Sequence, residues 1–334
     1  MKTALTELLG IELPIIMAPM FLVTSVDMIV AAGDSGIAGC IPALNFRTIE
    51  ELDKGLKEIK SKTSKPFGVN IIANKSNVLA KKQLHTCLDN GVNFFITSLG
   101  SPEEIIRESK KQGVRVFCDV IEENYAKKVE GLGADGIIAV NSGAGGHLGN
   151  IPASVLVPGL KKVCQIPIIS AGGVGNGAGI LSMLALGADG LSIGTPFIAT
   201  KESGVTNEYK QACIDYSAED IVTTSKLSGS RCTVINTPYV QKMGTEQNVV
   251  ESFLNKNKQF KKYAKMLTYY KGMGALQKAA FGATYKSVWC AGSSLEFTTE
   301  ISTVREIVER FKSEMTEAEA NLFKTLGQIG RAHV

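Results

Sequence analysis

Two glycine-rich turns have the composition of a phosphate-binding site. The first contains Ala171, Gly172 and Gly173, and the second contains Gly194 and Thr195. Glycine has no side chain, so the backbone can approach a ligand closely and present its N–H groups to it. A helical pattern follows the first turn, and the positive end of a helix favours an anionic phosphate. Tight turns explain most single Gly-Gly pairs, but two such turns at neighbouring strand ends predict a phosphate site.

A third small-residue loop, residues 141–149, carries the histidine best suited to catalysis. It reads Asn-Ser-Gly-Ala-Gly-Gly-His-Leu-Gly and includes Gly145 and His147. Small residues leave space for a flat ligand, and a neutral imidazole near pH 7 suits proton transfer. The other histidines are His85, in a predicted outer helix, and His333, near the end of the chain. An isolated histidine is more often structural, but the flanking glycines lead us to predict that His147 is catalytic.

Polar or accessible positions end three other apolar runs. Asn70 ends one of them, and a buried amide there needs a hydrogen-bond partner that the edge of a cofactor would supply. Ala18, Pro19 and Met20 end another, and we expect their main chain to lie along a cofactor ring. Asp119 ends a third run and is predicted to face the same site, with capping of the next helix as the alternative.

These residues must be positioned by a strand–helix pattern that repeats through residues 14–200. Most of its apolar runs are too uniformly apolar for half-exposed strands, which is typical of a parallel sheet buried on both faces. The predicted strands are residues 14–18, 36–41, 67–72, 92–97, 114–119, 136–140, 167–171 and 190–193. Eight such units predict an α/β fold, a TIM (β/α)8 barrel, whose sites form at the carboxyl ends of the strands. A Rossmann-like open sheet is the alternative, but no G-x-G-x-x-G sequence opens the first helix.

The strand rhythm stops near residue 204, which predicts a boundary there. Residues 1–204 would form the barrel. Residues 205–285 are polar, with helical patterns at 208–216 and 251–270, and are predicted to form a smaller, mainly helical cap that contributes to the substrate site. Residues 286–329 would return to the barrel as a segment and a helix from Glu300 to about Glu314, and residues 330–334 would be a tail.

Composition argues against several kinds of partner. The formal charge of +4 arises from 36 basic and 32 acidic side chains, too mild a balance to predict nucleic acid or an anionic membrane surface. No apolar run reaches the roughly 18 residues of a membrane span, and no signal peptide is visible. The seven cysteines are scattered without a C-x-x-C pair, which indicates reduced thiols in the cytoplasm. No metal-binding motif such as H-E-x-x-H occurs, so we expect no metal.

Together these segments resemble the nitronate monooxygenase (2-nitropropane dioxygenase) family, which includes NADH:quinone reductases and FabK-type enoyl-acyl-carrier-protein reductases. The resemblance covers nearly the whole chain, and the Gly-Gly-His-x-Gly loop ahead of the Gly-Gly turn is its most specific element. It rests on residues 14–20 (Pro-Ile-Ile-Met-Ala-Pro-Met), 66–70 (Pro-Phe-Gly-Val-Asn), 144–149 (Ala-Gly-Gly-His-Leu-Gly), 171–174 (Ala-Gly-Gly-Val), 194–197 (Gly-Thr-Pro-Phe), 272–275 (Gly-Met-Gly-Ala) and 289–292 (Trp-Cys-Ala-Gly).

The resemblance implies an FMN held without a covalent bond at the barrel mouth. Met20 and Asn70 would touch its ring, and Gly145 and His147 would lie near its reactive side. The phosphate would be held by Gly172, Gly173, Gly194 and Thr195. Asp119 stands where some relatives carry a cationic side chain, and Gly143 stands where many carry Glu. Both departures concern the substrate side, so the cofactor is better specified than the substrate.

The activity that the resemblance favours is nitronate monooxygenation. A nitronate would be oxidised with O2 to a carbonyl compound and nitrite, with His147 as base or as the group that orients the nitronate. The alternative is an NAD(P)H-dependent FMN reductase of the FabK or quinone reductase type, acting on an enoyl thioester or a quinone. A flavin-free phosphate-binding barrel isomerase is a third hypothesis, and Asp119 is the nearest residue to the Lys or Glu that it would need. A homodimer is compatible with the sequence.

Overall fold

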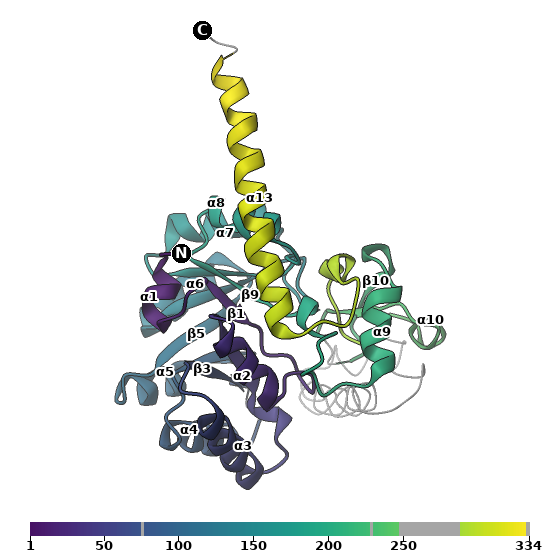
Figure 1. Ribbon diagram of the computed structural model, residues 1–334. Coiled ribbons are helices and arrows are strands. Elements are labelled where there is room, and N and C mark those ends of the chain that lie inside the picture. Colours follow the sequence, from purple (N-terminus) through teal and green to yellow (C-terminus); the bar gives the residue numbers. More distant parts are fainter. Residues whose placement is uncertain (75–76, 228–229, 247–287, 332–334) are drawn as a thin grey trace.

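Eight parallel strands close into a barrel in the computed structural model, which describes residues 1–74, 77–227, 230–246 and 288–331 (Figure 1). In barrel order they are β1 (Ile15–Met17), β2 (Ala38–Pro42), β3 (Phe67–Ile72), β4 (Phe94–Ser98), β5 (Arg115–Val120), β6 (Gly136–Val140), β8 (Ile168–Ala171) and β9 (Gly190–Ile193). The predicted TIM barrel is confirmed. The boundaries of β3, β6 and β9 agree with the predicted runs, and the other strands differ by one or two residues at one or both ends.

An outer layer of helices follows the strands, with the bounds α2 (Val26–Asp34), α3 (Ile49–Lys62), α4 (Ala80–Asp89), α5 (Glu103–Lys110), α6 (Glu123–Leu132), α7 (Ala153–Val163) and α8 (Gly177–Ala185). Helix α3 shows why these segments are helical. Leu52, Leu56 and Ile59 form one buried face at helical spacing. Its first turn is capped by the Thr48 hydroxyl, which accepts the N–H of Glu51. None of the described helices is both long and apolar enough to cross a membrane.

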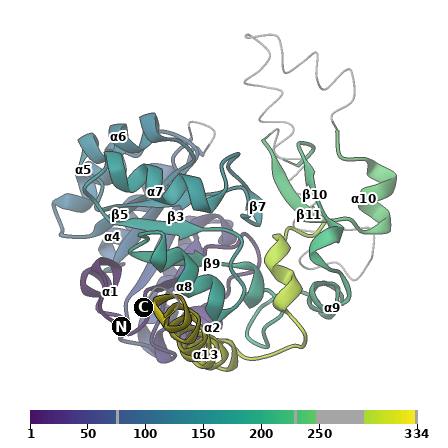
Figure 2. The ribbon, with the colours of Figure 1, turned by 90° about the horizontal axis from the view of Figure 1, so that it is seen from above.

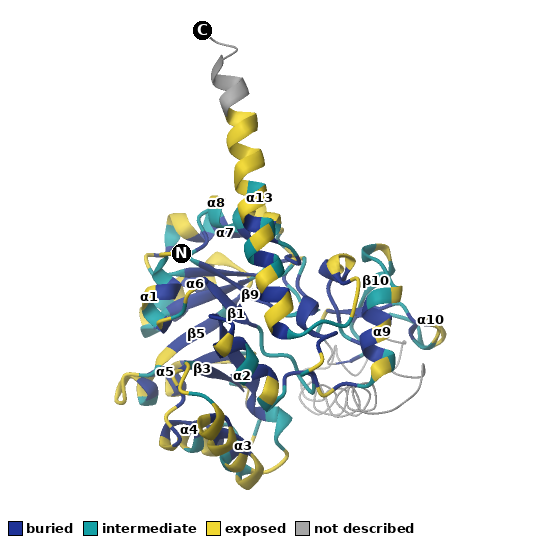
Figure 3. Ribbon diagram, in the orientation of Figure 1, coloured by how far each residue is buried: buried dark blue, intermediate teal, exposed yellow. Residues whose placement is uncertain are grey.

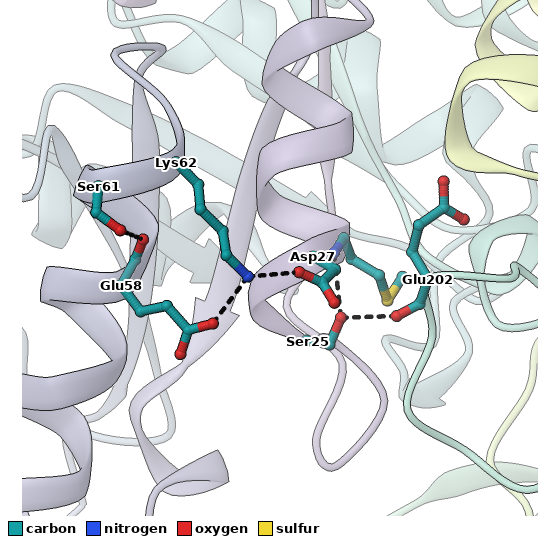
Figure 4. Close-up of polar contacts among 7 residues, drawn as sticks. Ser25, Asp27, Glu58, Ser61, Lys62 and Glu202 are labelled. Carbon is teal, nitrogen blue, oxygen red and sulfur yellow. Dashed lines mark hydrogen bonds and ion pairs between the residues drawn. The ribbon is translucent and has the colours of Figure 1, made fainter.

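Surface polar contacts fix α2 against its neighbours (Figure 4). The Ser25 hydroxyl caps α2 by accepting the N–H of Met28, and it donates to the carbonyl of Glu202 over 2.8 Å. Lys62 on α3 contacts Asp27 at 2.9 Å and Glu58 at 2.8 Å. Exposed ion pairs contribute at most about 1 kcal/mol each, so the partly buried hydrogen bond between Ser25 and Glu202 is the more informative contact. It ties the entrance of α2 to the chain that leaves the last barrel strand.

The amino end of the barrel is closed by α1 (Ala4–Leu9). Leu5 and Leu9 pack with Ile16, Phe94 and other side chains that fill the barrel interior. A Cβ added to Gly190 would lie 2.2 Å from the Leu5 side chain, so only glycine allows this plug to fit. Because the amino end is filled, a ligand can enter only from the carboxyl ends of the strands.

The carboxyl-terminal helix α13 (Val304–Arg331) packs against α8 and α2 and then runs past the barrel (Figure 1). It starts at Val304 rather than at the predicted Glu300, because Thr303 and Glu306 form a capping box that was not predicted. Beyond Met315 none of its described side chains is buried (Figure 3). The helix therefore extends well beyond the predicted end near Glu314 and includes the first residues assigned to the tail.

Beside the barrel mouth lies the described part of the predicted cap (Figure 2). It contains α9 (Asn207–Asp215) and α10 (Pro238–Met243), and α9 corresponds to the helical pattern at 208–216. It also contains β10 (Ile221–Thr224) and β11 (Cys232–Ile235), which were not predicted. They form an antiparallel sheet in the order β10–β11–β7, and β7 (Gly146–His147) comes from the histidine loop of the barrel. The 251–270 pattern lies outside the described residues, and the domain boundaries remain a prediction.

Four short 3-10 helices complete the described elements: η1 (Ala43–Asn45), η2 (Thr195–Phe197), η3 (Ala218–Asp220) and η4 (Ser293–Phe297). Two of them bear on the site. Helix η2 follows β9 directly at the predicted phosphate turn. Helix η4 follows the Trp-Cys-Ala-Gly segment and packs against η2 and η3.

Candidate active site

A cavity of about 850 Å³ opens at the carboxyl ends of the barrel strands. This size lies within the range of about 300–1,000 Å³ that small-molecule sites occupy. The structure brings every site residue predicted from the sequence into its wall: Ala18, Pro19, Met20, Asn70, Asp119, Gly145, His147, Ala171, Gly172, Gly173, Gly194 and Thr195. Their individual roles in binding and catalysis remain predictions. A separate hollow of about 270 Å³ lies behind Gly143 and Ala144 and contains none of these residues.

The turns after β8 and β9 form a cradle of unpaired backbone donors. Gly172 and Gly173 have φ values of +118° and +75°, a region that favours glycine. The N–H groups of Gly173, Gly194 and Thr195 donate to no other described residue. A Cβ added to Gly173 would meet only the Gly143 Cα, at 3.7 Å, because it would point into open space. Free N–H groups around such a hollow are suited to an anion.

Asn141, at the end of β6, connects this cradle to the histidine loop. Its Oδ1 accepts the N–H of Gly143 at 2.7 Å, and its Nδ2 donates to the carbonyl of Gly172 at 3.1 Å. Asn141 itself is 2% exposed, and both of its hydrogen bonds are at least partly shielded from solvent. Asn141 was not predicted to be a functional residue, although its polar side chain directly follows a buried strand, which was the available signal.

His147 is held in place by strand pairing with the cap. Gly146 and His147 pair with Thr233 and Cys232 of β11, and the Thr233 hydroxyl donates to the Ala144 carbonyl at 2.9 Å. The His147 side chain is exposed through the open cavity, but the surrounding loop and strand β11 still remove part of its hydration. This desolvation lowers the pKa of His147 from its ordinary value of 6.5. The imidazole is therefore mainly neutral at pH 7.

Gly145 allows the carboxyl-terminal segment to close over the loop. A Cβ on Gly145 would lie 2.8 Å from both the Gly292 nitrogen and the Thr195 Oγ1. The N–H of Gly292 donates to that Thr195 oxygen at 3.0 Å. The preceding Trp289 stacks on Tyr209 of α9, with ring centroids 5.4 Å apart. The segment therefore joins the phosphate turn, the histidine loop and the cap.

A polar chain crosses the ends of β3, β4 and β5. The Asn70 Nδ2 donates to the Ile96 carbonyl at 3.0 Å and to the Ser98 Oγ at 2.8 Å. Ser98 in turn donates to the Asp119 Oδ2. The Asn70 Oδ1 is thus left as an acceptor. Ser98 was missed by the sequence analysis because the predicted strand ended one residue before it.

Desolvation dominates the electrostatics of Asp119. Burial raises its pKa to about 6, and the hydrogen bond from Ser98 partly opposes this rise. The carboxyl group is therefore mostly ionised at pH 7. The charged side chains among the described residues that line the cavity are Asp119, Glu122 and Lys128. No group of three or more His, Cys, Asp or Glu side chains in the described ranges could hold a metal ion.

A flavin mononucleotide fits this arrangement. The unpaired N–H groups at the ends of β8 and β9 suit its phosphate, and the Asn70 Oδ1 can accept a ring N–H. Met20, Ile72 and Val140 supply apolar wall between these two ends. A Cβ on Gly194 would lie 3.4 Å from the Met20 sulfur, so the phosphate turn and the expected ring contact are neighbours.

Comparison with known proteins gives the family. The nitronate monooxygenase family model matches residues 2–314. This chain belongs to the nitronate monooxygenase family. It is an oxidoreductase with a TIM barrel, and its family and structural neighbours are flavin-dependent.

The relatives carry several names. A Rhodococcus jostii (3aS,4S,5R,7aS)-5-hydroxy-7a-methyl-1-oxo-octahydro-1H-indene-4-carboxyl-CoA dehydrogenase is 31% identical over 249 residues, 75% of this chain and 70% of the relative. A probable nitronate monooxygenase of Staphylococcus aureus is 26% identical, covering 75% of this chain and 83% of the relative. The structure of FabK from Thermotoga maritima is 30% identical with a TM-score of 0.85, covering 97% and 99% of the two chains. Nitroalkane oxidase from Streptomyces ansochromogenes, at 24% identity and a TM-score of 0.79 over 96% and 100%, shares the fold.

Proposed function

We propose that this protein binds FMN and uses NAD(P)H to reduce an uncharged, conjugated acceptor such as an enoyl thioester or a quinone. The observation that carries this choice is the charge of the cavity wall. Asp119, ionised at pH 7, lies at a barrel strand end, whereas the one lysine among the described lining residues, Lys128, is on helix α6. A carboxylate at this position disfavours an anionic nitronate, since like charges repel in a partly desolvated site.

We assign separate roles in this reaction to the backbone N–H groups and side chains of the cavity. The N–H groups of Gly173, Gly194 and Thr195 would bind the phosphate, and Asn70 would orient the ring through its Oδ1. FMN, when bound, supplies the hydride-transfer chemistry. Neutral His147 carries a proton on one nitrogen and could hydrogen-bond the carbonyl oxygen of the acceptor. The apolar wall contributed by residues such as Leu99 and Ile121 would exclude water from an apolar substrate.

The names of two relatives support the proposed reductase activity on a thioester. The Rhodococcus jostii dehydrogenase is named for a carboxyl-CoA substrate, and FabK is the nearest of the cited solved structures by TM-score. We extend to this chain the thioester class that the resemblance to FabK-type reductases implies. NAD(P)H as the donor and a homodimeric assembly remain predictions.

Nitronate monooxygenation is the second candidate. Family members carry that name, and a neutral imidazole in the cavity is the form that can accept a proton from a nitroalkane. This activity would require the site to bind an anion beside Asp119. Tight binding of a nitronate at pH 7 would therefore contradict our electrostatic argument.

Anaerobic mixing distinguishes these activities. The purified protein should be yellow, and NADH or NADPH should bleach the flavin absorbance in the absence of O2. An enoyl thioester or a benzoquinone should then restore the absorbance. Turnover of propionate 3-nitronate with O2, without bleaching by either nicotinamide, would overturn the reductase proposal in favour of the monooxygenase. A colourless protein that does not bind added FMN would overturn both and leave the flavin-free isomerase.

A further inference from the structure

Two cysteines from distant parts of the chain meet in the cavity wall. Cys232 lies on β11, and Cys290 lies in the segment that precedes η4, 58 residues later in the sequence. Their sulfur atoms are 3.9 Å apart, and both residues line the large cavity. The five other cysteines are buried: Cys40, Cys87, Cys118, Cys164 and Cys213.

The backbone around this pair is held so that the sulfurs stay adjacent. The N–H of Ile235, at the end of β11, donates to the carbonyl of Trp289 at 2.9 Å. The Tyr209 hydroxyl donates to the Cys290 carbonyl at 2.5 Å. A disulfide bond needs the sulfurs at about 2.05 Å, so the two side chains must close by roughly 2 Å through rotation at Cβ. The hydrogen bonds keep the two chain segments side by side while that rotation occurs.

The two sulfurs differ in access. Cys232 is 2% exposed, whereas Cys290 is half-buried and faces the cavity. A small molecule in the cavity would thus meet Cys290 first, and Cys232 would stand behind it as the second thiol.

We propose that Cys232 and Cys290 form a dithiol site that a peroxide entering the cavity oxidises to an intramolecular disulfide. The Cys290 sulfur attacks one peroxide oxygen, the O–O bond breaks, and a sulfenic acid and one water are formed. The Cys232 sulfur then attacks the sulfenic sulfur, the S–O bond breaks, and a second water leaves with the proton of the thiol. In sum, two thiols and one H2O2 give one disulfide and two waters.

Peroxide is the class of oxidant that the site favours over a larger disulfide such as oxidised glutathione. The contact with Cys232 and burial hold the pKa of the Cys290 thiol well above its usual range, so little thiolate is present at neutral pH and oxidation by either reagent is slow. The size of the oxidant is therefore what distinguishes them, because a small peroxide fits a position in the cavity wall that a tripeptide disulfide would reach with difficulty.

The disulfide would have a structural consequence for the active site. Strand β11 pairs with His147, and the segment that contains Cys290 continues to Gly292, which is bonded to Thr195. A covalent link between the two would fix the histidine loop to the predicted phosphate turn. This site is independent of the proposed electron donor and acceptor.

Mass spectrometry of the full-length protein tests the proposal. Trypsin places each cysteine alone in its own peptide, residues 232–242 and residues 287–305. After treatment with H2O2 and digestion without reductant, we expect these two peptides joined, lighter than their sum by two hydrogens, and separated again by dithiothreitol. We expect maleimide labelling to fall by two thiols per chain. Unchanged labelling, or loss of thiols without this linked pair, would overturn the proposal.

Variants and a second probe keep the test independent of folding defects. Cys290→Ser should abolish the linked peptides, whereas the matched control Cys164→Ser, at the end of α7, should retain them. In the unmodified protein, phenylarsine oxide, which bridges two nearby thiols, should protect Cys232 and Cys290 together from maleimide. Protection of other cysteines, or of neither, would contradict the pairing.

Discussion

The hydroxyl of Ser98 donates a hydrogen bond to the carboxylate of Asp119, with 2.5 Å between Oγ and Oδ2. The same Ser98 oxygen accepts the amide of Asn70, so the protonation of Asp119 and the orientation of Asn70 are linked through one hydroxyl group. An ionised Asp119 carboxylate can only accept hydrogen bonds, so the Ser98 hydroxyl donates to it. The Ser98 oxygen is then left to accept a hydrogen bond from the Asn70 Nδ2.

Replacement of Asp119 by Asn should stabilise the flavin-free protein increasingly as the pH rises. Burial raises the pKa of Asp119 from 3.8 to about 6 in the folded chain. Between these values the unfolded chain loses its proton first, so the carboxyl group costs stability as the pH rises from about 4 to 6. At 1.36 kcal/mol per pKa unit, the cost at neutral pH is at most about 3 kcal/mol. Urea unfolding at pH 4 and pH 7 measures this difference.

Asn retains an acceptor for Ser98, so this comparison isolates the charge. The matched control is Asp89→Asn, because Asp89 is an exposed carboxyl residue at the end of α4. We expect its effect on the urea midpoint not to grow between pH 4 and pH 7. An Asp119→Asn variant whose effect is the same at both pH values would refute the desolvation argument.

Replacement of Gly173 by Ala should weaken FMN binding more than it weakens the fold. Its φ of +75° imposes a strain of roughly 1–2 kcal/mol on any side chain. The added methyl group meets no protein atom closer than 3.7 Å, and it would instead fill the predicted phosphate cradle. Loss of at least 1.4 kcal/mol of binding energy corresponds to about a tenfold higher Kd. Titration of the apoprotein by quenching of FMN fluorescence gives the Kd.

Gly113→Ala is the control for that experiment. Gly113 has a φ of +70° and no heavy atom within 4 Å of an added Cβ, but it lies at the end of α5, away from the cavity. It should lose similar stability and retain FMN affinity. Equal Kd values for the two variants would remove Gly173 from the phosphate site.

The strands of the barrel and the motif residues of the site were predictable from the sequence, but the contacts around them were not. Strands such as β6 and β9 were predicted correctly because both of their faces are buried, which leaves a continuous apolar run between turns. The glycine turns and His147 could then be predicted as site residues, because each comes after such a run. The sheet that holds His147 was not predicted, since β10 and β11 are four residues each, although both are rich in β-branched residues.

The other residues that were not predicted contact the site through partners that are distant in the sequence. The sequence gives no local sign that Ser98 would lie between Asn70 and Asp119, because barrel closure and strand register produce that contact. The approach of Cys232 to Cys290 likewise depends on how the cap packs on the segment before η4. Residues that carry a motif are therefore predictable, whereas their partners from other strands are not.

Thr233→Val should loosen the histidine loop without changing the shape of the core. Thr233 is buried, and its hydroxyl donates to the Ala144 carbonyl at 2.9 Å. Loss of this bond should cost roughly 0.5–1.5 kcal/mol of unfolding free energy. Because β7 carries His147, we also expect a lower kcat with little change in the Kd for FMN.

Thr223→Val is the control, since the Thr223 hydroxyl has no hydrogen bond to any described residue. A normal kcat for Thr233→Val would show that this bond does not position His147.

His147→Ala should retain FMN and lose turnover. The predicted flavin contacts come from the strand ends and glycine turns, so the absorbance spectrum and the Kd for FMN should remain close to those of the unmodified protein. Removal of an acid–base or hydrogen-bonding group typically costs on the order of 10²-fold in rate. The unmodified enzyme should lose activity on acidification only below pH 6.5, because desolvation lowers the pKa of His147 and keeps the imidazole neutral above that value. The variant should lack this acid limb.

His85→Ala, on the exposed face of α4, serves as the control and should leave both the rate and the pH profile unchanged. A His147→Ala enzyme with the full rate and the same acid limb would assign the histidine to loop structure alone.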